Sequence, residues 1–126
     1  MADSVDRLYA AVLAARSADP ASSRTARLLR AGRSKMAKKL AEEAVEVVID
    51  AMNGHTDAVV RESADLLYNL VVLWVSSGVH PKDVWREMDR RERLFGIAEK
   101  LHKDAAENDA RRKVVTLESR RMHKRR

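Results

Sequence analysis

The chain has no cysteine among its 126 residues, and it has only two prolines, four glycines and five aromatic residues. The lack of cysteine excludes disulfide bonds, so nothing in the sequence requires an oxidising compartment. The scarcity of glycine and aromatic residues indicates helices that pack through alanine, leucine and valine. A chain of this length forms one domain with a single hydrophobic core.

A long hydrophobic run is also missing. The longest mainly apolar stretch, residues 66–75, is interrupted by Asn69 and is far too short to span a bilayer. The first residues do not combine a basic segment with an apolar one, so we expect no signal peptide and no membrane association. The default expectation is a cytoplasmic protein.

The pattern of apolar residues shows no strand-like alternation and no internal repeat, which predicts an all-α protein with a bundle of four to five helices. Asp19-Pro20, Gly32, Asn53-Gly54 and Gly78 mark the breaks between the helices. The predicted helices cover residues 4–18, a short segment capped by Ser22 or Ser23 and closed by Gly32, residues 34–52 with Ser34 as N-cap, residues 56–77, and a fifth segment from Pro81.

The fourth predicted helix is apolar nearly all round from Leu66 to Val75. A helix of that kind must be covered on every side, and one chain with four or five short helices covers it poorly. We therefore expect a homodimer whose helices complete a shared bundle.

Positive charge is concentrated near the C-terminal end. Residues 96–126 contain ten Lys or Arg against five Asp or Glu, so five of the six net positive charges lie there. We predict a helical domain over residues 1–95 and a basic extension over 96–126, which we interpret as a disordered tail.

Two short acidic clusters lie on neighbouring predicted helices: Glu42-Glu43-x-x-Glu46 and Glu62-x-x-Asp65. Helical periodicity places the last two carboxylates of the first cluster on one face, and both carboxylates of the second cluster on one face. An antiparallel pairing of the helices would aim these four side chains at one point. Oxygen ligands suit a hard cation, and no Cys or His lies in either cluster, which argues against zinc. The sequence therefore predicts a Mg²⁺ site with the ligands Glu43, Glu46, Glu62 and Asp65.

The position of Glu43 supports a cation site. A predicted core-facing stripe contains Met36, Leu40, Val47 and Ala51, and Glu43 lies between the second and third of these residues. An unpaired buried charge costs several kcal/mol, and two carboxylates about 5 Å apart repel by roughly 3 kcal/mol at an effective dielectric constant of 20. Something positive must therefore compensate.

The competing interpretation is a solvated helix face. Lys38 would then pair with Glu42, and Lys39 with Glu43, each pair contributing a few tenths of a kcal/mol at i,i+4 spacing.

The residues around both clusters resemble a known family. The first half contains Ser23-Arg24-Thr25, Leu28-Leu29, Gly32, Lys38-Lys39, Glu42-Glu43-Ala44 and Glu46-Val47-Val48. The second half contains Glu62-x-Ala64-Asp65-Leu66-Leu67-Tyr68, Val72, Gly78-Val79, Asp83-Val84 and Glu87. Because these motifs occur in this order along the chain, residues 22–91 resemble the all-α MazG-like superfamily of nucleotide pyrophosphohydrolases. The resemblance is closest to the phosphoribosyl-ATP pyrophosphatase family of that superfamily.

This resemblance implies a Mg²⁺-dependent enzyme of histidine biosynthesis. Such an enzyme hydrolyses the α-β phosphoanhydride of phosphoribosyl-ATP, giving phosphoribosyl-AMP and pyrophosphate. The resemblance implies catalytic roles for Glu42 and Glu43, with Glu42 as a ligand or a water-orienting base. Lys38 and Lys39 would face the substrate phosphates. A glycine-rich phosphate loop is absent, so the metal and the lysines would have to replace its backbone amides.

Three positions depart from the pattern of that family. Ala41 stands where we expect glycine, Arg24 where an aromatic residue is common, and Asn69 where histidine often follows the Leu-Tyr pair. They leave open a pyrophosphohydrolase that acts on another nucleoside triphosphate. A second alternative is a non-enzymatic helical protein that binds nucleic acid through the basic tail. The acidic clusters disfavour it, because a protein that binds polyanions gains nothing from a focused negative pocket.

Overall fold

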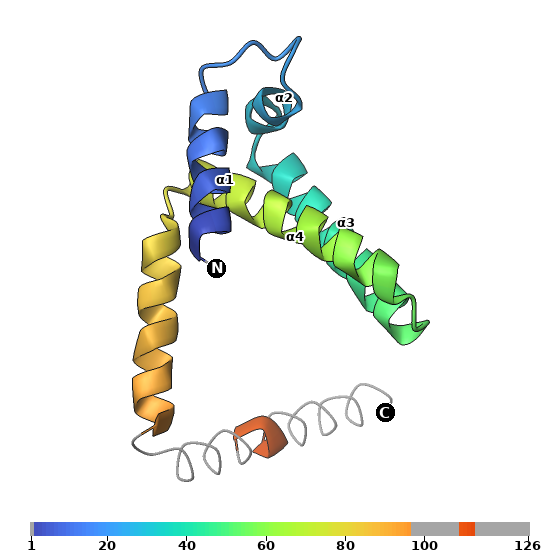
Figure 1. Ribbon diagram of the computed structural model, residues 1–126, viewed down its shortest axis with the longest axis vertical. Helices are drawn as coiled ribbons and strands as arrows, with labels where there is room; N and C mark the ends of the chain where they lie inside the picture. The colour runs from blue at the N-terminus through green and yellow to red at the C-terminus, as the bar shows by residue number, and fades with distance from the viewer. Residues whose placement is uncertain (1, 97–108, 113–126) are drawn as a thin grey trace, which may run out of the picture. The chain divides into compact units, whose positions relative to one another are not determined.

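The computed structural model describes residues 2–96 and 109–112 (Figure 1). These residues form helices and no strand, so the predicted all-α class is confirmed. The chain divides into two units, residues 1–84 and 85–126. Most of the predicted basic extension, residues 97–108 and 113–126, lies outside the described residues.

The first unit contains α1 (Ala2–Ala15), α2 (Arg24–Ala31), α3 (Arg33–Met52) and α4 (Thr56–Ser77). The helices α3 and α4 run antiparallel and lie side by side along their length (Figure 1). The other two helices pack at one end of this pair, the end that contains the N-terminus of α3. There α1 packs against α4, and α2 packs against both α3 and α4. A further helix covers residues 81–96.

Local sequence explains the ends of α2 and α4. The residue before α2, Ser23, has extended backbone angles, and its hydroxyl accepts a hydrogen bond of 3.1 Å from the backbone N–H of Ala26, as an N-cap should. The predicted bounds of α4 are confirmed. Gly78 ends that helix in the left-handed region at φ 74°, and the N–H of Val79 donates to the carbonyl of Trp74 at 2.9 Å.

The predicted start of α3 is wrong at one residue, because Ser34 is not an N-cap. The helix already begins at Arg33, and Gly32, with φ 97°, precedes it. The carbonyl of Gly32 accepts the hydrogen bond of 3.2 Å from the N–H of Met36. One glycine therefore ends α2 and begins α3, which leaves no position for a separate capping residue.

The first helix ends three residues earlier than predicted, at Ala15. The N–H of Ala18 donates to the carbonyl of Ala15 at 3.1 Å, so this segment already turns with bonds to the third residue back. Tight bonding of that kind is common after the last turn of a helix.

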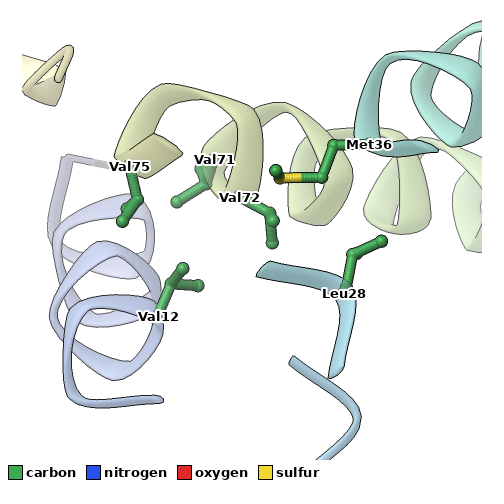
Figure 2. Packing of buried hydrophobic residues seen from close by; sticks show 6 residues of the cluster. All are labelled: Val12, Leu28, Met36, Val71, Val72 and Val75. Atoms are coloured by element: carbon green, nitrogen blue, oxygen red, sulfur yellow. The ribbon is translucent and has the colours of Figure 1, made fainter. Parts of the chain in front are cut away.

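The core lies where the four helices meet. Figure 2 shows Val12 of α1, Leu28 of α2, Met36 of α3, and Val71, Val72 and Val75 of α4 pointing toward one another. Each of these side chains is at most 8% exposed. A hydrogen bond of 2.6 Å between Thr25 Oγ1 and the hydroxyl of Tyr68 also joins α2 to α4. Trp74 is partly buried and packs against this core as well.

The opposite end of the α3–α4 pair exposes apolar side chains. On α3 the exposed residues are Val45, Val48, Ile49 and Met52, and on α4 they are Val60 and Leu67. Ala51, which was predicted to face the core, is also exposed, because the core packing of α1 and α2 lies at the other end of the pair. No helix in residues 2–96 or 109–112 is long and apolar enough to cross a membrane.

Candidate metal centre

Three carboxylates come together between α3 and α4. Glu43, Glu62 and Asp65 each offer an oxygen, and these three oxygens lie within 4.8 Å of one another. Glu43 lies near the middle of α3, whereas Glu62 and Asp65 are three residues apart on α4 and so share one face. The antiparallel helix pair thus brings the two acidic clusters of the sequence to one place.

The carboxylate of Glu43 is the most constrained of the three. Its Oε2 atom is buried and has no hydrogen-bond partner. Buried polar atoms nearly always have a partner, and leaving a charged one unsatisfied is destabilising. The predicted ion pairs do not relieve it, because among the described residues neither Lys38 nor Lys39 forms a salt bridge. The interpretation as a solvated face with i,i+4 pairs therefore fails at this position.

Negative charge is crowded around Glu62 as well. Its pKa is raised from 4.5 to about 7, first because its carboxyl group hydrogen-bonds with Glu46 and then because it hydrogen-bonds with Glu43. Burial and repulsion by both carboxylates add to this effect. In the metal-free protein this crowding therefore favours the protonated form of Glu62 below about pH 7. Glu46 lies beside Glu62, although it is outside the group of three that share a common point.

The other predicted site residues lie on α3 near the cluster. Glu42 is exposed and does not belong to the group of three. Lys38 is exposed and Lys39 is half-buried, and both precede the carboxylates by about one helical turn. Two surface hollows, of about 500 and 390 Å³, are lined by other residues.

The donor set fits Mg²⁺. All the converging atoms are carboxylate oxygens, which hard divalent cations prefer, and Mg²⁺ usually keeps several waters and binds few protein groups. The buried Oε2 of Glu43 supplies an acceptor that a cation would satisfy. Three carboxylates leave room in an octahedral shell for water and phosphate oxygens.

One polar residue on the same helix as Glu62 and Asp65 was not predicted as a site residue. Asn69 interrupts an apolar run of the sequence and departs from the family pattern, and in the structure it is only 5% exposed, with its Nδ2 atom donating to the backbone carbonyl of Asp65 at 2.8 Å. The signal that would have identified it is its spacing. It follows Asp65 by four residues and Glu62 by seven, so it lies on the same face of α4.

Comparison with known proteins decides the family. Residues 5–92, well over half of the chain, match the model of the family described as phosphoribosyl-ATP pyrophosphohydrolase. The chain belongs to this family. The matched segment of the phosphoribosyl-ATP pyrophosphohydrolase family contains both acidic clusters, so the resemblance predicted from them is confirmed.

Relatives in the phosphoribosyl-ATP pyrophosphohydrolase family include proteins that match this chain over nearly their whole length. The protein named phosphoribosyl-ATP pyrophosphatase 2 of Bradyrhizobium diazoefficiens is 67% identical over 133 aligned residues, which cover 99% of both chains. The protein of the same name from Rhodopseudomonas palustris is 66% identical over 131 residues, covering both chains completely. Phosphoribosyl-ATP pyrophosphatase of Gluconobacter oxydans is 52% identical over 96 residues, which cover 76% of this chain and 72% of that one.

Proposed function

We propose that this protein hydrolyses phosphoribosyl-ATP between its α and β phosphates, giving phosphoribosyl-AMP and pyrophosphate in histidine biosynthesis. The observation that supports the reaction is the convergence of Glu43, Glu62 and Asp65 within the segment that matches the family. The names of relatives that span the whole chain support the substrate. We assign the activity to residues 1–95 and regard residues 96–126 as an extension. We also expect a cytoplasmic location, because the proposed substrate is an intracellular nucleotide.

The metal in this proposal is Mg²⁺, held by the three converging carboxylates with Glu46 beside them. When bound, it would neutralise phosphate oxygens and stabilise the charge that develops during phosphoryl transfer. Glu62 would hold the metal as an ionised carboxylate, so metal binding would compete with its proton. A bound cation would also give the buried oxygen of Glu43 a partner.

The remaining roles fall to residues on the adjacent part of α3. Glu42 is exposed next to Glu43, where its carboxylate would orient the attacking water and accept its proton. Lys38 and Lys39 form no salt bridge among the described residues, so their ammonium groups are available for the substrate phosphates. No covalent intermediate is needed for this hydrolysis.

We also propose that two copies of the chain pair through α3 and α4. The exposed apolar residues of α3 recur at i, i+3, i+4 and i+7, which is the spacing of a helix face that packs against another helix: Val45, Val48, Ile49 and Met52. Val60 and Leu67 form a second exposed pair on α4, seven residues apart. Exposed apolar surface of this kind is typical of an interface. A second copy would also provide walls for the acidic cluster, since Asp65 is exposed.

Measurement of pyrophosphate release tests the proposed reaction. Phosphoribosyl-ATP and the ordinary ribo- and deoxyribonucleoside triphosphates are each supplied with Mg²⁺ and, separately, with EDTA. We expect Mg²⁺-dependent release and the highest kcat/KM for phosphoribosyl-ATP. A hundredfold preference for another nucleotide, about 2.7 kcal/mol in transition-state binding, would overturn the substrate but leave the reaction class. No release from any nucleotide would overturn the enzymatic function.

A further inference from the structure

The smaller of the two surface hollows, of about 390 Å³, lies where three helices of the first unit come together. Its lining combines the residue that follows α1 with parts of α2 and the last turn of α4: Arg16, Ala26, Leu29, Arg30, Val75 and Ser76. The larger hollow, by contrast, is lined only by residues of the continuous segment 54–61. Helix packing therefore builds the smaller hollow, and its volume falls within the range of small-molecule sites.

Part of this lining is apolar and fixed by the core. Ala26 is 2% exposed and Val75 is 7% exposed, so neither side chain can move far. Leu29 is partly buried and packs against the same core. Covering these side chains with an apolar group removes hydrocarbon surface from water, which favours binding of a ligand that has an apolar part.

The polar part of the lining is dominated by two exposed arginines, Arg16 and Arg30. In the part of the chain that the structure describes, neither guanidinium group forms an ion pair or a hydrogen bond. No residue of the lining is acidic, and residues 20–41 contain seven Lys or Arg and no Asp or Glu. Guanidinium groups bind phosphate through two parallel hydrogen bonds, and two of them match the charge of a phosphate monoester.

A simpler role for these arginines is to offset the negative ends of two helices. Arg30 lies in the last turn of α2, and Arg16 directly follows α1. However, the carbonyl groups of residues 13–15 at the end of α1 already accept hydrogen bonds from the N–H groups of residues 16–18. The simpler role also does not explain why both guanidinium groups line one hollow together with buried apolar side chains.

The hollow is separate from the acidic cluster. Ser76 follows Asp65 by eleven residues on α4, a rise of roughly 16 Å along the helix axis. Between them lie Val71 and Val72, which are 1% and 0% exposed and belong to the core. The core thus lies between the two places along this helix, and a ligand in the hollow does not occupy the candidate metal centre.

We propose that this hollow is a second anion-binding site, which takes a phosphate monoester carried on a small apolar group. The phosphate binds to the guanidinium groups of Arg16 and Arg30, and the apolar group covers Ala26, Leu29 and Val75. This site goes beyond the proposed hydrolysis and does not depend on it, because none of its residues belongs to the acidic cluster.

Phenyl phosphate is a suitable probe, because it joins a dianionic phosphate to a small apolar ring. It is titrated into the full-length protein in EDTA, and binding is followed by ¹H–¹⁵N NMR of the arginine Nε–Hε groups and the backbone amides. We expect saturable shifts at Arg16, Arg30 and Ser76. The Kd of phenyl phosphate should be at least tenfold lower than those of inorganic phosphate, which lacks the ring, of benzoate, which has one charge, and of phenol.

Variants of the two arginines test the assignment of the site. Arg16→Gln and Arg30→Gln should each raise the Kd of phenyl phosphate at least tenfold, because each removes charge-assisted hydrogen bonds to the phosphate. Arg33→Gln is the matched control: it removes the same charge from an exposed position of the same basic segment, outside the hollow. It should change the Kd by less than twofold, and so should Glu43→Gln in the acidic cluster. Circular dichroism establishes that each variant is folded.

Four results would overturn the site. The first is the absence of saturable shifts at Arg16, Arg30 and Ser76 in wild-type protein. The second is an equal weakening in Arg33→Gln, which would show that only the general positive charge attracts the probe. The third is a loss of binding in Glu43→Gln, and the fourth is inorganic phosphate or benzoate that binds as tightly as phenyl phosphate. A failure of pyrophosphate release would contradict the proposed function and leave this site untouched.

Discussion

Glu43 places a buried carboxylate oxygen without a partner on the face of α3 that meets α4. Replacing it with glutamine removes one of the repelling charges and one ligand together. Glu43→Gln should lower kcat for pyrophosphate release by about a thousandfold or more, roughly 4 kcal/mol. It should also melt at a higher temperature than wild-type protein when both are free of metal.

The metal response of the same variant provides the control. Mg²⁺ at a hundred times its Kd should stabilise the wild-type fold by about 2.7 kcal/mol through mass action, and EDTA should reverse this. Glu43→Gln should lose most of that response. Glu42→Gln should keep it while losing activity, because Glu42 lies outside the group of three carboxylates. A wild-type melting curve that is indifferent to Mg²⁺, together with an active Glu43→Gln enzyme, would contradict the site.

Glu62 makes the stability of the metal-free protein depend on pH. Its pKa in the folded state is about 7 rather than 4.5, chiefly through hydrogen bonding to Glu46 and then to Glu43. Because the folded state holds the proton more tightly, the stabilising contribution is complete below about pH 4.5 and is lost as pH rises through about 7. In EDTA, the Tm of wild-type protein should therefore fall relative to that of Glu62→Gln between these pH values. A difference in Tm that stays constant across this range would contradict the shared proton.

At the scale of the helices, the starts of α2 and α3 predict different contributions of two serines to the free energy of unfolding. Ser23 caps α2 through its hydroxyl, whereas Ser34 lies inside α3 and makes no cap hydrogen bond. Ser23→Ala should lower the free energy of unfolding by about 1 kcal/mol, and Ser34→Ala should change it by less than about 0.5 kcal/mol. Urea denaturation followed by circular dichroism measures both. Equal losses would show that Ser34 is a cap after all.

Helix α4 shows how much of the fold could be predicted from the sequence. Its ends were predictable because Gly78 adopts a positive φ and stops the helix, and because Asn53-Gly54 separates it from α3. The end of α1 was not predictable in this way, since residues 16–18 contain no glycine or proline, and the change to hydrogen bonds with the third residue back leaves no signal in the sequence. The exposure of Ala51 was missed for a similar reason. Periodicity identifies an apolar face but does not say how far the neighbouring helices reach along it.

The candidate site was predictable to a similar extent. The spacing of the carboxylates on two helices was sufficient to bring Glu43, Glu62 and Asp65 to one place. It did not reveal that Glu46 hydrogen-bonds with Glu62 and lies to one side of that group, because this depends on the axial offset of α3 and α4. It also did not reveal the burial of Asn69 or its hydrogen bond to the backbone carbonyl of Asp65, which arise only in the packed helix.

The whole molecule should be a dimer in solution. Val48 is 60% exposed in the middle of the apolar face of α3, so a charge placed there would be buried unpaired in the proposed interface. Val48→Glu should shift the protein from dimer to monomer in sedimentation equilibrium. Lys35→Glu, an exposed position in the first turns of α3, should leave the dimer intact. A wild-type protein that is monomeric at micromolar concentrations would contradict the proposed pairing.

The most direct test of the proposed activity is to follow phosphoribosyl-ATP by ³¹P NMR during incubation with the wild-type protein in Mg²⁺. We predict that the three triphosphate signals give way to one pyrophosphate signal and one phosphomonoester signal, with the phosphate of the phosphoribosyl group unchanged. Neither EDTA-treated protein nor Glu43→Gln should produce these signals. Release of orthophosphate, or turnover that persists in EDTA, would contradict a Mg²⁺-dependent hydrolysis between the α and β phosphates at the carboxylates of α3 and α4.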